Sequence, residues 1–267
     1  MKKKVILFSI VLLNFFSINA QDFEVAPVKL DFTAEPGETQ SKTITIRNHG
    51  NRKTAFVINL GDFQPDSKGN KQKMKANTTK HSCANWISIS PAFFELNPND
   101  EKTITVNMQV PVDDYSTRWA MIYVKTTQEQ TAFTADKTLR AGVTVSGRIA
   151  VLVYQSPKSN TNYSATINNL IEVTEAQDTI RKFTANIDNI GDKIMQCKVY
   201  LIASNLQTAE ETNFDPITIE SFPKSSQTVE LKFPKNILPT GKYALAAVLD
   251  FGSKTNLEGT QLLITVP

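Results

Sequence analysis

The sequence contains few side chains that could carry catalytic or metal chemistry. It has two His and two Cys. His49 lies in a predicted turn after a strand, whereas His81 and Cys83 lie two residues apart in a polar stretch. These two could supply zinc ligands, but a structural zinc site needs four, and no CxxC or HExxH motif completes the set. Neither His fits a pattern for nucleophilic or acid–base catalysis. We therefore predict no metal site, no cofactor and no enzymatic activity.

The two cysteines leave two alternatives open. Cys197 alternates with Met195, Val199 and Leu201, which predicts the buried face of a strand, whereas Cys83 lies in a polar stretch. Either they remain a buried thiol and a loop thiol, or a disulfide joins the two halves of the chain. An oxidising compartment permits such a bridge without requiring it.

The first twenty residues form a predicted signal peptide, residues 1–20. Three lysines precede an apolar run from Val5 to Leu13, and small Ala20 precedes Gln21 at the expected cleavage position. This segment holds three Lys and no acidic residue, so its removal takes the formal net charge from +3 to zero. No basic patch for nucleic acid is then indicated. No later run approaches the roughly 20 apolar residues that span a bilayer, so we expect no transmembrane segment in the mature chain.

The elements that position the remaining residues are strands, arranged in a repeat. The sequence is rich in Phe, Val, Ile and Thr, which favour strands, and no long segment shows helical periodicity. An Asn-x-Gly turn follows an alternating strand twice, at 48–50 and 189–191, and Pro98 and Pro223 occupy matching positions 125 residues apart. The first copy is longer by about 16 residues, which we place at 61–84 as a long loop or an added hairpin.

Short strands separated by frequent turn signals are typical of antiparallel sandwiches. We predict an all-β protein of two tandem immunoglobulin-like β-sandwich domains after the signal peptide. The predicted boundaries are an N-terminal domain at 21–154, a linker at 155–160 and a C-terminal domain at 161–267.

A long alternating segment runs from Leu139 to Val153, where apolar side chains recur at every second position except Gly147. It exceeds the usual strand of roughly 5–6 residues. In one interpretation it is the final strand of the first domain and buries its apolar face there. In the other, its upstream part is presented to another chain as an added strand, with backbone pairing and alternate side chains as contacts. The candidate partner-binding residues are then Leu139, Ala141, Val143 and Val145.

The first half of the sequence resembles the N-terminal domain of PapD-like periplasmic pilus-assembly chaperones. The segments that carry the resemblance occur in the same order: Val28–Phe32, Ile44–Asn48, Ser90-Pro91, Leu96–Pro98, Thr117–Tyr123 and Gly147–Tyr154. The signal peptide and a second Ig-like domain also fit the family. The second domain of this chain looks more like generic Ig-like domains of bacterial surface proteins.

The resemblance implies a periplasmic, non-enzymatic protein that binds subunits of the cell envelope or surface. Members of the family lend a subunit the last strand of their first domain and anchor its C-terminal carboxylate with two basic residues in the interdomain cleft. Lys29 resembles the first of these by its place in the opening strand. Arg148 fills the second position only if the strand is shifted, since the two alignments place Ala150 or Val151 there. The alternative is an Ig-like structural or adhesion module, secreted or at the cell surface, without chaperone activity.

The signal peptide predicts that the exported protein begins near Gln21. Mass spectrometry of exported protein should show a chain that lacks the first twenty residues. Exported material that retains Met1 would contradict this prediction.

Overall fold

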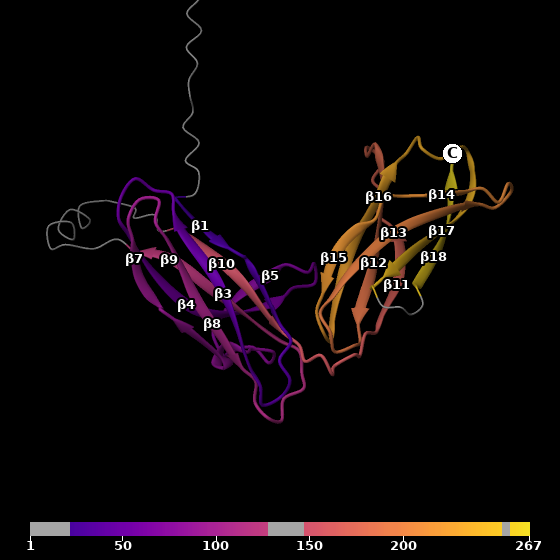
Figure 1. The fold of residues 1–267 in the computed structure, drawn as a ribbon. Helices are drawn as coiled ribbons and strands as arrows, with labels where there is room; N and C mark the ends of the chain where they lie inside the picture. Colours follow the sequence, from indigo (N-terminus) through magenta and orange to yellow (C-terminus); the bar gives the residue numbers. More distant parts are fainter. Residues whose placement is uncertain (1–21, 128–146, 253–256) are drawn as a thin grey trace, which may run out of the picture.

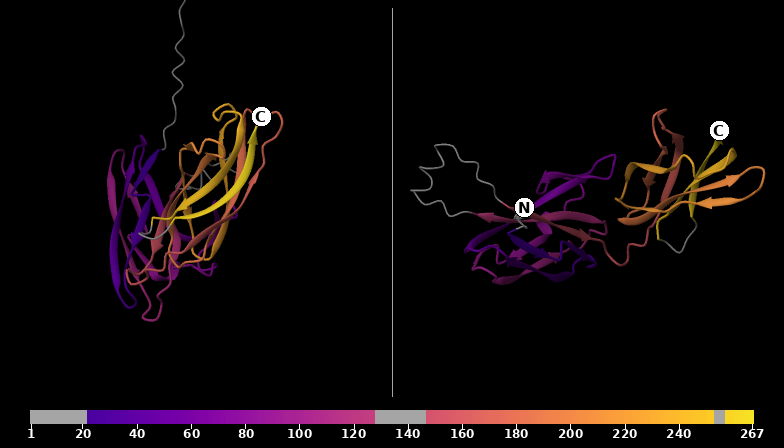
Figure 2. Two further views of the ribbon diagram at one scale, coloured as in Figure 1. Left: turned by 90° about the vertical axis from the view of Figure 1, so that its right-hand side faces the viewer. Right: turned by 90° about the horizontal axis from the view of Figure 1, so that it is seen from above.

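The computed structural model describes residues 22–127, 147–252 and 257–267. It is almost entirely β, with one short 3-10 helix, η1 (Ala84–Trp86). Figure 1 shows two β units that meet at one end of each and enclose an angle, and Figure 2 shows the same arrangement from the side and from above. The predicted all-β class is confirmed.

The first unit is a sandwich of two sheets. One contains, in spatial order, β1 (Phe23–Ala26), β3 (Thr39–Asn48), β8 (Glu101–Gln109) and β6 (Ile87–Ser90). The other contains β2 (Lys29–Phe32), β10 (Arg148–Gln155), β9 (Arg118–Thr127), β4 (Thr54–Pro65) and β5 (Lys71–Lys75), with β7 (Phe93–Leu96) paired to β4. Its named strands pair antiparallel, except that β2 runs parallel to β10, with Lys29 opposite Leu152.

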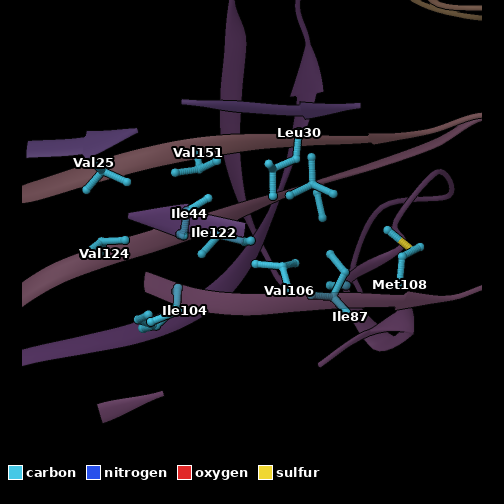
Figure 3. Close-up of a cluster of buried hydrophobic side chains, with 14 of the residues drawn as sticks. Val25, Leu30, Ile44, Ile87, Ile104, Val106, Met108, Ile122, Val124 and Val151 are labelled. Carbon is cyan, nitrogen blue, oxygen red and sulfur yellow. The ribbon is translucent and has the colours of Figure 1, made fainter. Parts of the chain in front are cut away.

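The core of this sandwich follows from alternation along its strands. Side chains at every second position point between the sheets, because successive strand residues face opposite sides. Figure 3 shows the result as a layer of branched apolar side chains, among them Ile44, Ile104, Val106, Ile122, Val124 and Val151, all fully buried.

The second unit is a smaller sandwich. One sheet contains β11 (Ala165–Glu172), β12 (Ile180–Asn189) and β16 (Ser225–Pro234). The other contains β14 (Glu211–Asn213), β13 (Met195–Asn205), β17 (Gly241–Asp250) and β18 (Glu258–Val266), with β15 (Ile217–Ser221) also paired to β13. The hydroxyl of Tyr243 donates to the carbonyl of Pro239 at 2.9 Å, a bond back to the preceding loop that is typical of Ig-like sandwiches.

The predicted repeat is confirmed by two buried asparagines with matching bonds. The side-chain amide of Asn48 donates to the carbonyl of Arg52 at 2.9 Å and to that of Leu96 at 3.1 Å. That of Asn189 donates to Lys193 at 2.9 Å and to Ser221 at 3.2 Å. Leu96 and Ser221 each precede the matching proline by two residues. Each Asn therefore ties a turn to a distant strand of its own domain.

The extra residues of the first copy form the β4–β5 hairpin, in which Gly61 pairs with Lys75 and Pro65 with Lys71. The carboxylate of Asp66 accepts backbone bonds from Lys68 and Asn70 at the hairpin tip. Of the two alternatives predicted for 61–84, a long loop or an added hairpin, the structure shows the hairpin.

The cysteines are both unpaired thiols, each buried in the core of a different domain. Burial of Cys197 on β13 is as predicted. Cys83 lies in a loop, as expected, but the polar chain around it folds inward and buries it fully: the Ser82 hydroxyl donates to the buried carboxylate of Asp62 at 2.7 Å, beside Cys83. Burial raises the pKa of both thiols, that of Cys197 to about 11.

Replacing Asn48 by Ala should lower the free energy of unfolding of the first domain by about 1–3 kcal/mol, because buried carbonyls lose their donor. Denaturant unfolding measures this. Asn51→Ala, in the same turn but exposed, is the control and should change stability little. Equal effects of the two changes would contradict the role assigned to Asn48.

Candidate functional site

The candidate site lies where the two domains meet. Strands β9 and β10 are apolar on both faces, so they bury one face in the first core and present the other outward. Trp119, Met121 and Tyr123 on β9 and Tyr154 on β10 belong to the outward face and form a second apolar cluster. That cluster gives the second domain a surface on which to pack.

Phe222, in the turn after β15, is a buried side chain of the second domain that belongs to this cluster, and partly buried Ile194 packs against it. Phe222 is only 1% exposed. Its ring lies 5.1 Å from Trp119, 5.5 Å from Phe63 and 5.9 Å from Tyr154, centroid to centroid, in edge-to-face geometry. The indole nitrogen of Trp119 donates to the carbonyl of Phe63 at 2.9 Å. The domains are therefore joined through a closely packed group of aromatic rings.

A carboxylate from the second domain lies beside these rings. Glu220, on β15, accepts bonds from the hydroxyl of Tyr154 at 2.7 Å and from the amide of Gln196 at 2.8 Å. Its oxygens lie 2.9 Å from Nζ of Lys71 and 3.8 Å from Nζ of Lys29. The side chain of Glu220 is 15% exposed. Burial, and then the bond to Glu220, raises the pKa of the Tyr154 hydroxyl, so it stays protonated and donates.

The two lysines come from strands at opposite edges of one sheet of the first domain. Lys29 comes from β2, and its Nζ lies 4.7 Å from the ring centroid of Tyr154 and 3.2 Å from exposed Asp31. Lys71 comes from the added hairpin, with Nζ 5.5 Å from the ring centroid of Phe222. The aromatic faces attract the ammonium groups and hold them at the domain junction.

The connection between the domains is also held by polar contacts. Lys193 donates to the hydroxyl of Ser156 at 2.7 Å, and the backbone amide of Ser159 donates to Glu35 at 2.9 Å. At the hairpin tip, the backbone amide of Thr228 donates to the carbonyl of Ser67 at 2.8 Å. Contacts on both sides of the aromatic cluster therefore restrict the angle between the domains.

The sequence-predicted residues separate into three groups. Lys29 lies at the domain junction. Arg148 does not, because Lys29 is opposite Leu152, and four residues of strand place Arg148 about 13 Å away at about 3.3 Å per residue. The guanidinium of Arg148 instead lies 4.8 Å from the ring centroid of Tyr123. Leu139, Ala141, Val143 and Val145 lie outside the described residues.

Sequence reasoning missed Lys71 and Glu220. The available signal was the position of Lys71 within the extra residues of the first copy, but nothing in the spacing links it to Glu220. His81, considered as a zinc ligand with Cys83, stacks on Trp119 at 4.5 Å, and burial lowers its pKa. Within residues 22–127, 147–252 and 257–267, no group of three or more His, Cys, Asp or Glu could hold a metal ion, and no helix is long and apolar enough to cross a membrane.

Solved structures with a similar fold include fimbrial chaperones. A chain from a chaperone–tip adhesin complex of CFA/I fimbriae biogenesis is 12% identical, with a TM-score of 0.50, and the match covers 92% of this chain and 99% of that one. The class 5 fimbriae chaperone CfaA is 12% identical over the same shares, with a TM-score of 0.46. The E. coli chaperone DraB is 12% identical over 90% and 98% of the two chains, with a TM-score of 0.42.

The likeness to the first of these chains, at a TM-score of 0.50, confirms the predicted fold of two tandem Ig-like domains. No protein-family model matches the sequence, and no curated protein sequence matches it.

Replacing Phe222 by Ala should weaken the packing of the domains by about 3–5 kcal/mol, the usual cost of truncating a buried aromatic side chain. Small-angle X-ray scattering should then show a larger radius of gyration, and Trp119 fluorescence should shift to longer wavelength. Phe214→Ala is the control, because Phe214 packs on Phe233 inside the second domain. A Phe222→Ala protein with unchanged scattering and fluorescence would refute this role.

Proposed function

We propose that the protein binds protein subunits of the cell envelope or surface and acts as their assembly chaperone by lending them a strand. The observation that carries this proposal is an open strand edge in the first domain. Strand β10 pairs with β9 along its whole length, but β2 covers its other edge only from Leu152 to Gln155. Along Arg148–Val151, no strand among the described residues pairs with that edge.

An open edge offers backbone N–H and C=O groups to an incoming strand. A partner strand paired with Arg148–Val151 would lie in line with β2, on the same side of β10. If it runs parallel to β10, its C-terminal end would contact Lys29, the first residue of β2. An ammonium group at that point favours a chain that ends in a carboxylate. The chaperone-like fold of the protein is consistent with this mode of binding.

The segment just before β10 supplies the second half of the proposal. Leu139, Ala141, Val143 and Val145 alternate in the sequence, in phase with Val151 and Val153 of β10. In the proposed complex these side chains enter an apolar groove of the partner, and backbone pairing sets the register. The predicted signal peptide supports export, and with it a location in the periplasm.

A second candidate is an envelope or surface module without chaperone activity. The observation in its favour is that Lys29 already contacts Glu220 and Asp31. In this case the charged cluster only fixes the angle between two Ig-like domains, and partners bind elsewhere.

The test compares Val143→Asp/Val145→Asp with wild type in capture of envelope proteins. Strand donation predicts that the double variant stays folded and loses its partners. Burying a neutral polar group without a hydrogen bond costs about 2–7 kcal/mol, and burying an unpaired carboxylate costs more. Thr144→Asp, on the opposite parity, is the matched control and should retain binding. Mass spectrometry identifies the captured proteins.

If the first domain unfolds in the double variant, the two valines belong to its own core and strand donation is wrong. Lys29→Ala provides the second arm of the same experiment and should weaken capture, because a charge-assisted bond to a carboxylate contributes about 1.5–3 kcal/mol. Unchanged capture by folded forms of both variants would favour the surface module.

A further inference from the structure

The cluster around Glu220 has the composition of a carboxylate-binding site. A phenol hydroxyl, a side-chain amide and two ammonium groups all point toward one carboxylate, at 2.7, 2.8, 2.9 and 3.8 Å. Three of these four groups belong to the first domain, and the carboxylate belongs to the second. The first domain therefore carries a set of donors that recognises a carboxylate from outside itself.

We infer that Glu220 occupies this site in the free protein as an internal ligand, and that the carboxylate of a bound partner displaces it. Lys71 then acts with Lys29 as the second cation of the site. This inference rests on the proposed function, because it takes the partner to bring a carboxylate to Lys29. It adds a residue, Lys71, and a competing group, Glu220, that neither the sequence nor the comparisons identify.

Charge balance favours exchange over simple addition. The cluster holds Lys29 and Lys71 against Glu220 and exposed Asp31. If a second carboxylate bound beside Glu220, two negative charges would lie close together in a largely buried site. Their repulsion would disfavour simple addition. If one carboxylate replaces another, the cluster keeps its charge and Tyr154 keeps an acceptor.

Exchange also couples partner binding to the domain junction. Glu220 is separated from Phe222 by one residue, and it is linked to Tyr154, Lys29 and Lys71 across the junction. Release of Glu220 removes those links while the aromatic rings stay in contact. By linkage, whatever strengthens the Glu220 contacts weakens partner binding by the same factor.

The test measures binding of a short, N-terminally acetylated, alternating valine–threonine peptide, with either a free C-terminal carboxylate or a C-terminal amide. Isothermal titration gives the dissociation constants. Glu220→Gln keeps the size of the side chain and removes its charge, so this variant should bind the free acid at least about tenfold more tightly than wild type, because the competent state is no longer blocked. Both proteins should bind the amide equally weakly.

Lys71→Gln in the Glu220→Gln background should reduce the preference for the acid, because only Lys29 then remains as a cation of the site. Lys73→Gln, on the same hairpin strand, and Glu211→Gln, exposed on β14, are the matched controls and should leave the dissociation constants unchanged. Thermal unfolding verifies that each variant is folded, and Glu220→Ala provides a second variant without the charge.

Equal affinity of wild type and both Glu220 variants for the acid would overturn the inference, as would equal binding of acid and amide by these variants, or no binding by any of them. The outcome is separable from that of the proposed function. Strand donation alone would be refuted if the peptide binds as described but capture of envelope proteins is unaffected by Val143→Asp/Val145→Asp. Capture that needs Val143 and Val145 but is unaffected by Glu220→Gln, with no peptide exchange, would refute the inference alone.

Discussion

Strands β9 and β10 have apolar side chains on both faces. The first core buries one face, and the second domain packs on part of the other. One face closes the first core, with Ile122 and Val151 fully buried. The other face cannot be covered from within the same sandwich, because the second sheet of that sandwich already lies on the inner side. The second domain covers part of it by inserting Phe222 among the rings of Phe63 and Trp119. The domain junction is thus a consequence of strand composition.

The charged cluster satisfies a requirement that this junction creates. A carboxylate that is mostly removed from water needs donors, or its desolvation is left uncompensated. Glu220 obtains them from Tyr154, Gln196 and two lysines, one of which is carried by the hairpin that distinguishes the first repeat from the second. The hairpin therefore supplies Lys71 to the junction as well as backbone contacts between the domains.

The sequence was sufficient for the architecture because its signals are local. Alternation predicts strands, the two Asn-x-Gly turns and matched prolines predict the repeat, and the excess length of the first copy predicts a long loop or an added hairpin. The sequence was less informative about the site. Alternation predicts which side chains are buried, but it does not predict which residues pack against them. Trp119, Met121 and Tyr123 belong to one apolar run in the sequence, yet they face away from the core that buries Ile122.

The same limit explains the outcomes at single residues. Lys29 was identified by its place in the opening strand, which depends on local sequence order. Arg148 has the parity of Leu152 and Tyr154, but its distance from Lys29 depends on the register between β2 and β10, which alternation does not specify. Lys71 and Glu220 are 149 residues apart in the sequence, and only the packing of one domain on the other brings them together.

Lys29 belongs both to the end of the open edge of β10 and to the charged cluster around Glu220. Among the residues that the structure describes, no strand pairs with this edge along Arg148–Val151, and the edge ends where β2 begins, at Lys29. A chain that pairs with this edge is led by its own backbone toward the lysines that hold Glu220. In the proposed complex, backbone pairing along the strand supplies the affinity, and charge at the end of the partner chain sets its position. In that complex, a partner whose final residue lies one position too early or too late would pair with the strand but miss the lysines, so the proposed site would favour one register among those that an alternating strand allows.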